Sequence, residues 1–107
     1  EQLVLPAEPR GCRSSWYLHT VRIRRGGAKN RDRIVEDLRK KSVGAAVYYH
    51  TPIHQMPCYQ QFGTYMLSNT EKAAQQVFSL PVHPEVTSKN IQYIANAVKI
   101  AVKEHAS

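Results

Sequence analysis

Long apolar runs are absent from this 107-residue chain, and cysteines are scarce. No stretch reaches the roughly 18 apolar residues that a membrane-spanning helix needs, and no basic-then-apolar leader is visible. The two cysteines, Cys12 and Cys58, lie far apart and form no CxxC pair. A disulfide between them is one alternative, but two reduced thiols are the simpler expectation. We therefore expect a cytoplasmic domain without a membrane partner.

Signatures of self-contained catalysis are also missing. No glycine-rich phosphate loop is present, because Gly26-Gly27 is an isolated pair. No paired carboxylates lie in the apolar segments, and Ser14, Ser15 and Ser42 have no histidine or acid close by in sequence, which leaves only a triad formed in space. We therefore assign no catalytic residue from these motifs.

A possible metal-binding pattern is weakened by proline. His50, His54 and Cys58 form a His-x3-His-x3-Cys series, and this spacing would align zinc ligands on a helix. However, Pro52 lies between the histidines and Pro57 precedes the cysteine, so one continuous helix is not expected. The sequence therefore predicts no metal site.

Acidic residues are scarce in one third of the chain. The formal net charge is +7, and residues 10–41 hold eleven Lys or Arg against three acidic residues, a net of +8. Trp16 and Tyr17 lie within this basic region, and aromatics beside arginines suit single-stranded RNA or a nucleotide. A basic RNA- or nucleotide-binding module is therefore one hypothesis. A solvated helix face with a surface loop is the simpler interpretation.

The pattern of the remaining residues predicts a two-layer α+β fold, with a small, mainly antiparallel sheet of about three strands covered on one side by helices. The N-terminal residues 1–13 read as a linker or extended lead-in, and residues 14–107 as one domain. The predicted strands are 14–25, 45–49 and a short extended stretch after Leu80-Pro81. The predicted helices are 31–42, 57–61, 68–78 and a last helix from Thr87 to Glu104.

Local signals set the expected ends of these helices. Asn30 and Thr87 are candidate N-caps, and Ser68 with Glu71 matches the capping-box pattern. Gly44 is the expected end of the first long helix, and Gly63 ends the short one.

The densest group of functional side chains follows the second predicted strand. The run Val47-Tyr48-Tyr49-His50-Thr51-Pro52-Ile53-His54 holds two tyrosines and two histidines around a rigid proline. Polar and aromatic groups on a loop at a strand end are a common way for a scaffold to present a site. We take this run as the candidate binding loop.

Four segments carry a family resemblance: Trp16–Ile23, Arg31–Leu38 with Ser42-Val43-Gly44, Tyr49–Tyr59, and Ser79–Thr87. Together they resemble the C-terminal domain of the DegT/DnrJ/EryC1/StrS family, whose members are fold-type I, PLP-dependent aminotransferases that act mostly on nucleotide-linked keto sugars. The resemblance covers the chain from about Pro6 to His105. The last two segments are the most specific, and His50 and Met56 depart from the family pattern, which has Pro and Gln there.

The resemblance implies a pyridoxal 5'-phosphate (PLP) cofactor held mostly by an absent N-terminal large domain, which would supply the Schiff-base lysine. It also implies a homodimer, a nucleotide-sugar substrate and an amino-acid donor. The isolated chain is then expected to be inactive, and a dehydratase or regulatory role stays open.

The same resemblance implies that His54 and Tyr49 face the active-site cleft and bind substrate or cofactor. We include His50 among the expected substrate-binding residues because it lies next to Tyr49 in the loop. The simpler alternatives are that Tyr49 is a core aromatic and that His54 braces the loop.

Overall fold

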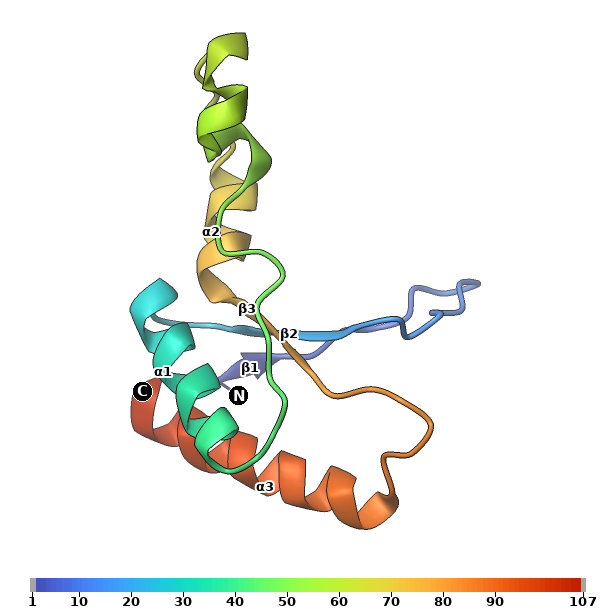
Figure 1. Cartoon of the computed structure of the whole chain (residues 1–107). Helices are drawn as coiled ribbons and strands as arrows, with labels where there is room; N and C mark the ends of the chain where they lie inside the picture. Colours follow the sequence, from blue (N-terminus) through green and yellow to red (C-terminus); the bar gives the residue numbers. More distant parts are fainter. Residues whose placement is uncertain (1, 107) are drawn as a thin grey trace.

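A three-stranded antiparallel sheet lies at the centre of the computed structural model, which describes residues 2–106. Strand β1 (Leu3–Val4) pairs with β2 (His19–Ile23), and β2 pairs with β3 (Val77–Leu80). Helices α1 (Ala28–Lys40) and α3 (Ser88–His105) pack on the same face of this sheet (Figure 1). The predicted two-layer α+β fold is therefore confirmed.

The hydrophobic core fills the space between the sheet and these two helices. In the register of the sheet, Val21 stands opposite Phe78, and both side chains are fully buried. Burial of such side chains supplies the main stabilising free energy of a small domain. The helices complete the core with buried residues at three-and-four spacing: Ile34, Val35 and Leu38 from α1, and Ala97, Val98, Ala101 and Val102 from α3.

The predicted strands were only partly correct. The strand predicted at 14–25 is limited to β2, because Trp16 adopts a left-handed backbone (φ 50°), which extended pairing excludes. The strand predicted at 45–49 is wrong, since only Ala46 forms a bridge, to Ser79, before the chain leaves the sheet.

The third strand lies earlier than predicted, because β3 ends at Leu80 and the stretch after Leu80-Pro81 forms no strand. Val77 and Phe78 were assigned to a helix, but α2 (Ser68–Gln76) ends before them and they pair with β2. A β-branched and an aromatic residue gain more from pairing and packing in a sheet than from one more helical turn. Leu3 and Val4, within the predicted lead-in, also join the sheet, and the domain boundary near residue 13 stays a prediction.

The predicted ends of α1 were wrong. Its N-cap is Gly27, and the Asn30 side chain, inside the helix, donates a hydrogen bond to the carbonyl oxygen of His105. The helix ends at Lys40 rather than near Gly44, and Ser42 takes the left-handed conformation (φ 59°) that the exit requires.

Two other caps test the sequence signals separately. Thr87 caps α3 as predicted, in a reciprocal capping box with Asn90. The box predicted at Ser68 does not form, because Leu67 is the N-cap of α2. Glu71 instead accepts a hydrogen bond from the Leu67 N–H at 3.0 Å.

Two arms project from the body, which consists of the sheet with α1 and α3. The looped arm is residues 5–18, and the helical arm is residues 48–76, which include the 3-10 helices η1 (Ile53–Gln55) and η2 (Pro57–Phe62) and then α2 (Figure 1). The short helix predicted at 57–61 and its end at Gly63 are confirmed.

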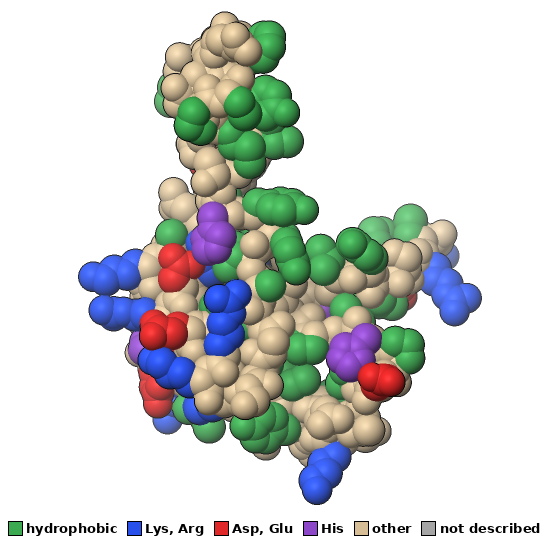
Figure 2. Space-filling model, in the orientation of Figure 1, with side chains coloured by type: hydrophobic (Ala, Val, Ile, Leu, Met, Phe, Trp, Pro, Cys, Tyr) green, Lys and Arg blue, Asp and Glu red, His purple; other side chains and the backbone are tan. Residues whose placement is uncertain are grey.

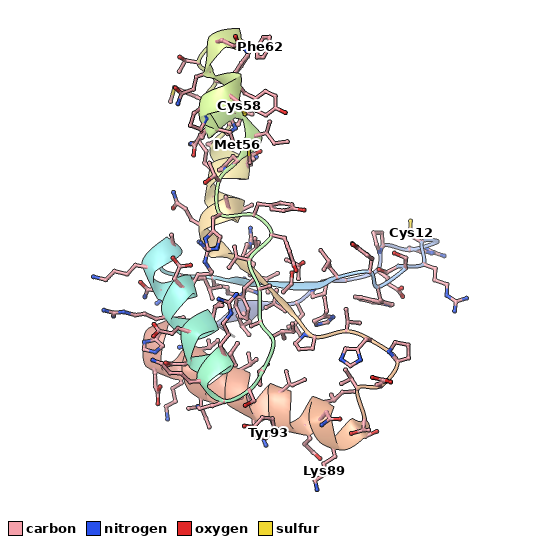
Figure 3. All side chains as sticks on the ribbon, viewed as in Figure 1. Cys12, Met56, Cys58, Phe62, Lys89 and Tyr93 are labelled. Carbon is pink, nitrogen blue, oxygen red and sulfur yellow. The ribbon has the colours of Figure 1, made fainter. Side chains whose placement is uncertain are left out.

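The arms make the molecule unusually extended. The radius of gyration is 15.3 Å, whereas a compact chain of this length has a value of about 13 Å. Cys12 and Cys58 lie on different arms, far from each other, and both are free thiols (Figure 3). Within residues 2–106, no helix is both long and apolar enough to cross a membrane.

Candidate functional site

The candidate binding loop begins where the chain leaves the sheet and enters the helical arm. Ala46 is hydrogen-bonded to Ser79 through both backbone groups, at 2.7 and 3.1 Å, and is the last residue tied to the sheet. Pro52 is extended at the start of η1. The loop is thus anchored at one end to the body and at the other to the arm.

Tyr49 projects into solvent. Its residue surface is 72% exposed, and its ring makes an edge-to-face contact with Tyr48 at a centroid distance of 5.6 Å. The alternative that Tyr49 is a core aromatic is therefore wrong for this chain. An exposed phenol offers a hydroxyl that can both donate and accept a hydrogen bond, and a face on which a planar group can stack.

His50 lies against the beginning of α1. Its Nδ1 atom is 3.4 Å from Nη2 of Arg31 and 3.9 Å from a carboxylate oxygen of Asp32. Because a guanidinium can only donate, the contact with Arg31 requires Nδ1 as the acceptor and leaves Nε2 to carry the proton of the neutral ring. The ring is largely exposed, so Nε2 is available to a ligand.

His54 is placed differently, because its side chain is only 8% exposed. Its Nε2 atom lies 3.0 Å from Oε1 of Glu71, a bond that joins η1 to the first turn of α2. This hydrogen bond, followed by the one from the Leu67 N–H, holds the pKa of Glu71 below its usual value. In this structure His54 braces the helical arm, as one of the sequence interpretations stated.

Arg31 holds the loop, the body and the arm together, and sequence reasoning did not single it out. Its side chain is buried, and Nη1 donates to the carbonyl oxygens of Ala74 at 2.8 Å and Val77 at 3.0 Å. Nε donates to Asp32 at 2.6 Å. These bonds fix the junction of α2 and β3 against α1, beside His50.

A sequence signal for Arg31 did exist. Arg31 precedes Ile34, Val35 and Leu38 at the i, i+3, i+4, i+7 spacing of one helix face. That face is the buried one, so the periodicity alone places an arginine in the core, where it needs hydrogen-bond partners.

The three predicted site residues contact different partners and do not form one closed pocket. None of them lines either of two surface cavities, of about 600 and 540 Å³, which lie along α3. His50, His54 and Cys58 also do not gather as metal ligands. Among residues 2–106, the one cluster with ligand atoms close enough for a metal ion is Asp37, Glu104 and His105.

Most basic residues gather on the body, but Arg10 and Arg13 belong to the looped arm. Figure 2 shows Lys and Arg side chains concentrated over the α1 side of the body. Trp16 and Tyr17 instead belong to the looped arm, where Trp16 packs against His19 at 5.7 Å. The basic residues are therefore divided between the α1 side of the body and the looped arm, where Arg10 and Arg13 accompany the exposed Trp16 and Tyr17.

The comparisons with known proteins point to one family. A model of the DegT/DnrJ/EryC1/StrS aminotransferase family matches residues 1–99. A pleiotropic regulatory protein of Geobacillus stearothermophilus is 30% identical over 98 residues, which are 90% of this chain and 25% of the relative.

Solved structures agree in fold. PseC of Helicobacter pylori, an aminotransferase involved in the biosynthesis of pseudoaminic acid, is 30% identical, with a TM-score of 0.77 over 85% of this chain and 24% of its own. A Streptococcus pneumoniae protein solved in its PLP form is 20% identical, with a TM-score of 0.83 over 99% of this chain and 28% of its own. The chain thus spans only about a quarter of the length of the proteins it matches.

Proposed function

Because the chain belongs to the DegT/DnrJ/EryC1/StrS aminotransferase family, we propose that it is the small C-terminal domain of a PLP-dependent aminotransferase. The substrate we propose is a nucleotide-linked keto sugar, with an amino acid as the donor. Tyr49 and His50, at the base of the helical arm, would form part of the active-site wall.

The observation that carries this proposal is the exposure of the helical arm. Tyr49, Ile53, Phe62, Tyr65 and Met66 are all exposed on it, although each would gain free energy by burial. Figure 2 shows apolar side chains gathered along one side of the arm. An exposed apolar patch of this kind marks an interaction surface. The arm is thus suited to complete a site built mainly by another part of the protein.

The residues of this chain do not by themselves fit PLP. A PLP enzyme needs a lysine for the Schiff base and an acidic partner for the pyridine nitrogen. The lysines here are exposed or half-buried on the surface, and Lys40 is already paired with Glu36 at 3.0 Å. We therefore assign the Schiff-base lysine to the large domain and expect the isolated chain to be inactive.

The role we propose for this chain is in binding. The His50 Nε2 and the Tyr49 hydroxyl can hydrogen-bond sugar hydroxyls, a carboxylate or a phosphate. His54 would not contact the substrate; its bond to Glu71 would hold η1 against α2 and so keep the binding loop in position. The family resemblance further supports a homodimer in the cytoplasm as the working form.

The test is a transamination assay on the longer protein that contains this chain, with PLP, an amino donor and candidate nucleotide keto sugars. A PLP absorbance band that is lost when the proposed Schiff-base lysine is replaced is the expected result. A protein without that lysine, or without transamination of any keto sugar, would overturn the enzyme proposal.

The site residues need separate variants. We expect Tyr49→Phe and His50→Ala each to reduce kcat/KM for the sugar by about tenfold or more, as the loss of one good hydrogen bond does. Tyr93→Phe is the matched control, because Tyr93 is an exposed tyrosine of α3 whose hydroxyl donates to the Lys41 carbonyl oxygen. Equal kcat/KM values in all three variants would remove Tyr49 and His50 from the site.

A further inference from the structure

An apolar groove of about 600 Å³ runs between the sheet and the N-terminal half of α3. Leu3 and Val21 line it from the sheet, and Ile91, Ile94 and Val98 line it from the helix. Its polar lining is limited to His19, His83 and Lys99. A small-molecule site needs several convergent polar groups to orient its ligand, so this lining is better suited to apolar side chains.

The groove exists because α3 is only half covered. The C-terminal half of the helix packs on α1 and buries Ala97, Ala101 and Val102, whereas Ile91 near its start is 57% exposed. Figure 1 shows α1 lying over the end of α3 that is near the C-terminus. Ile91, Ile94 and Val98 continue the same helix face at three-and-four spacing. One apolar stripe is thus core at one end and solvent-exposed at the other.

The shape of the groove favours a helix as its occupant. A two-layer α+β domain is stable when helices cover the whole apolar face of its sheet. Here the open part lies in the corner between the sheet and α3, where a helix about 10 Å in diameter can contact both walls. The matched proteins are about four times as long as this chain, so they have ample chain outside the matched region to supply it.

We propose that an amphipathic helix from outside residues 1–107 of the same polypeptide binds in this groove and completes the helical layer of the domain. The proposal rests on that part of the proposed function which places the chain in a longer protein. It is independent of the reaction that the protein catalyses.

Cysteine protection in the longer protein tests the proposal. Ile91→Cys reports on the groove, and Ile100→Cys is the matched control, since Ile100 is an isoleucine of the same helix, 49% exposed, that does not line the groove. Cys12 and Cys58 are exposed and are first replaced by serine. We expect a maleimide to label the Ile91→Cys variant at least about tenfold more slowly than the Ile100→Cys variant, because covered sites react only through local opening.

Two results of the labelling experiment would overturn the proposal. Protection of the thiol in the Ile91→Cys variant should not change on dilution, because the helix belongs to the same polypeptide. Protection that is lost on dilution would indicate a second copy and overturn the proposal. Labelling of the Ile91→Cys variant as fast as the Ile100→Cys control would show an open groove and would also overturn it.

A photo-crosslinking amino acid in place of Ile91 then identifies the occupant. We expect a crosslink to an amphipathic segment of the same polypeptide outside residues 1–107. A crosslink into residues 1–107 of a second copy would contradict the proposal.

The PLP band and transamination are measured on the same samples. An active enzyme whose Ile91→Cys thiol is unprotected would refute the groove proposal alone. An inactive protein whose Ile91→Cys thiol is protected would refute the proposed reaction alone.

Discussion

The body and the helical arm place the same kinds of side chain in opposite surroundings. Phe78 in β3 is completely buried between the sheet and the helices, whereas Phe62 at the tip of the arm is 67% exposed. The body therefore has a core of its own, and the arm has an apolar surface without one. The difference indicates that the body supplies stability and that the arm serves an interaction.

The strongest test of this comparison is a pair of phenylalanine substitutions. Phe78→Ala should lower the free energy of unfolding by about 3–5 kcal/mol, because it removes a buried ring and leaves a cavity. Phe62→Ala should change it by less than about 0.5 kcal/mol, because the ring is solvated in both states. Urea unfolding followed by circular dichroism measures both. Similar losses in the two variants would mean that the arm belongs to the core.

The second test concerns the junction between the two regions. Arg31→Met should cost about 2–3 kcal/mol, because it leaves the buried carbonyl oxygen of Ala74 and the partly buried one of Val77 without this donor. Arg33→Met is the matched control on the same helix, since Arg33 is exposed, and it should cost less than about 0.5 kcal/mol.

The arm should also respond to the loss of Arg31. Amide exchange in α2 should accelerate in the Arg31→Met variant relative to the Arg33→Met control. If α2 exchanged at the same rate in both variants, Arg31 would not be what joins the arm to the body.

Elements with local signals were predictable from the sequence. The stripe of α3 and its cap at Thr87 depend on residues within four positions of each other, and both were predicted correctly. Strand β3 was misassigned because its stability comes from pairing with β2, more than fifty residues earlier. Propensity within a short window cannot register such a partner.

The candidate site also combines features set by neighbouring residues with features set by residues far apart in the sequence. The position of the loop was predictable from the proline and polar residues close by in sequence, although the strand expected before it does not form and the exposure of Tyr49 was left open. The roles of Arg31 and His54 depend on Ala74, Val77 and Glu71, which lie 17 to 46 residues away. The sequence therefore located the loop but not the contacts that hold it.

Two histidine–carboxylate pairs extend the comparison to pH. In the body, Nε2 of His105 lies 2.7 Å from Asp37 and joins α3 to α1. In the arm, His54 lies 3.0 Å from Glu71. In each pair the hydrogen bond from histidine is the main cause that lowers the pKa of the carboxyl group. The ordinary pKa values from which they are lowered are 3.8 for Asp37 and 4.5 for Glu71.

A carboxyl group whose pKa is lowered by folding stabilises the fold at pH values above its unfolded pKa. That contribution is lost as the pH falls through the lower, folded pKa. Asp37→Asn should therefore reduce the free energy of unfolding near pH 5, by about 1 kcal/mol or less for such a partly exposed pair. The difference from the unsubstituted protein should shrink as the pH falls below 3.8, and urea unfolding across this range measures it.

Glu71→Gln should behave differently because its pair lies in the arm. Global unfolding should hardly change, while exchange of the Leu67 amide, which donates to Glu71, should accelerate by less than about fivefold near pH 5. This local effect should also fade below pH 4.5, since the carboxylate is then being protonated in the unsubstituted protein. If Glu71→Gln instead lowered global stability as much as Asp37→Asn, the arm would unfold together with the body.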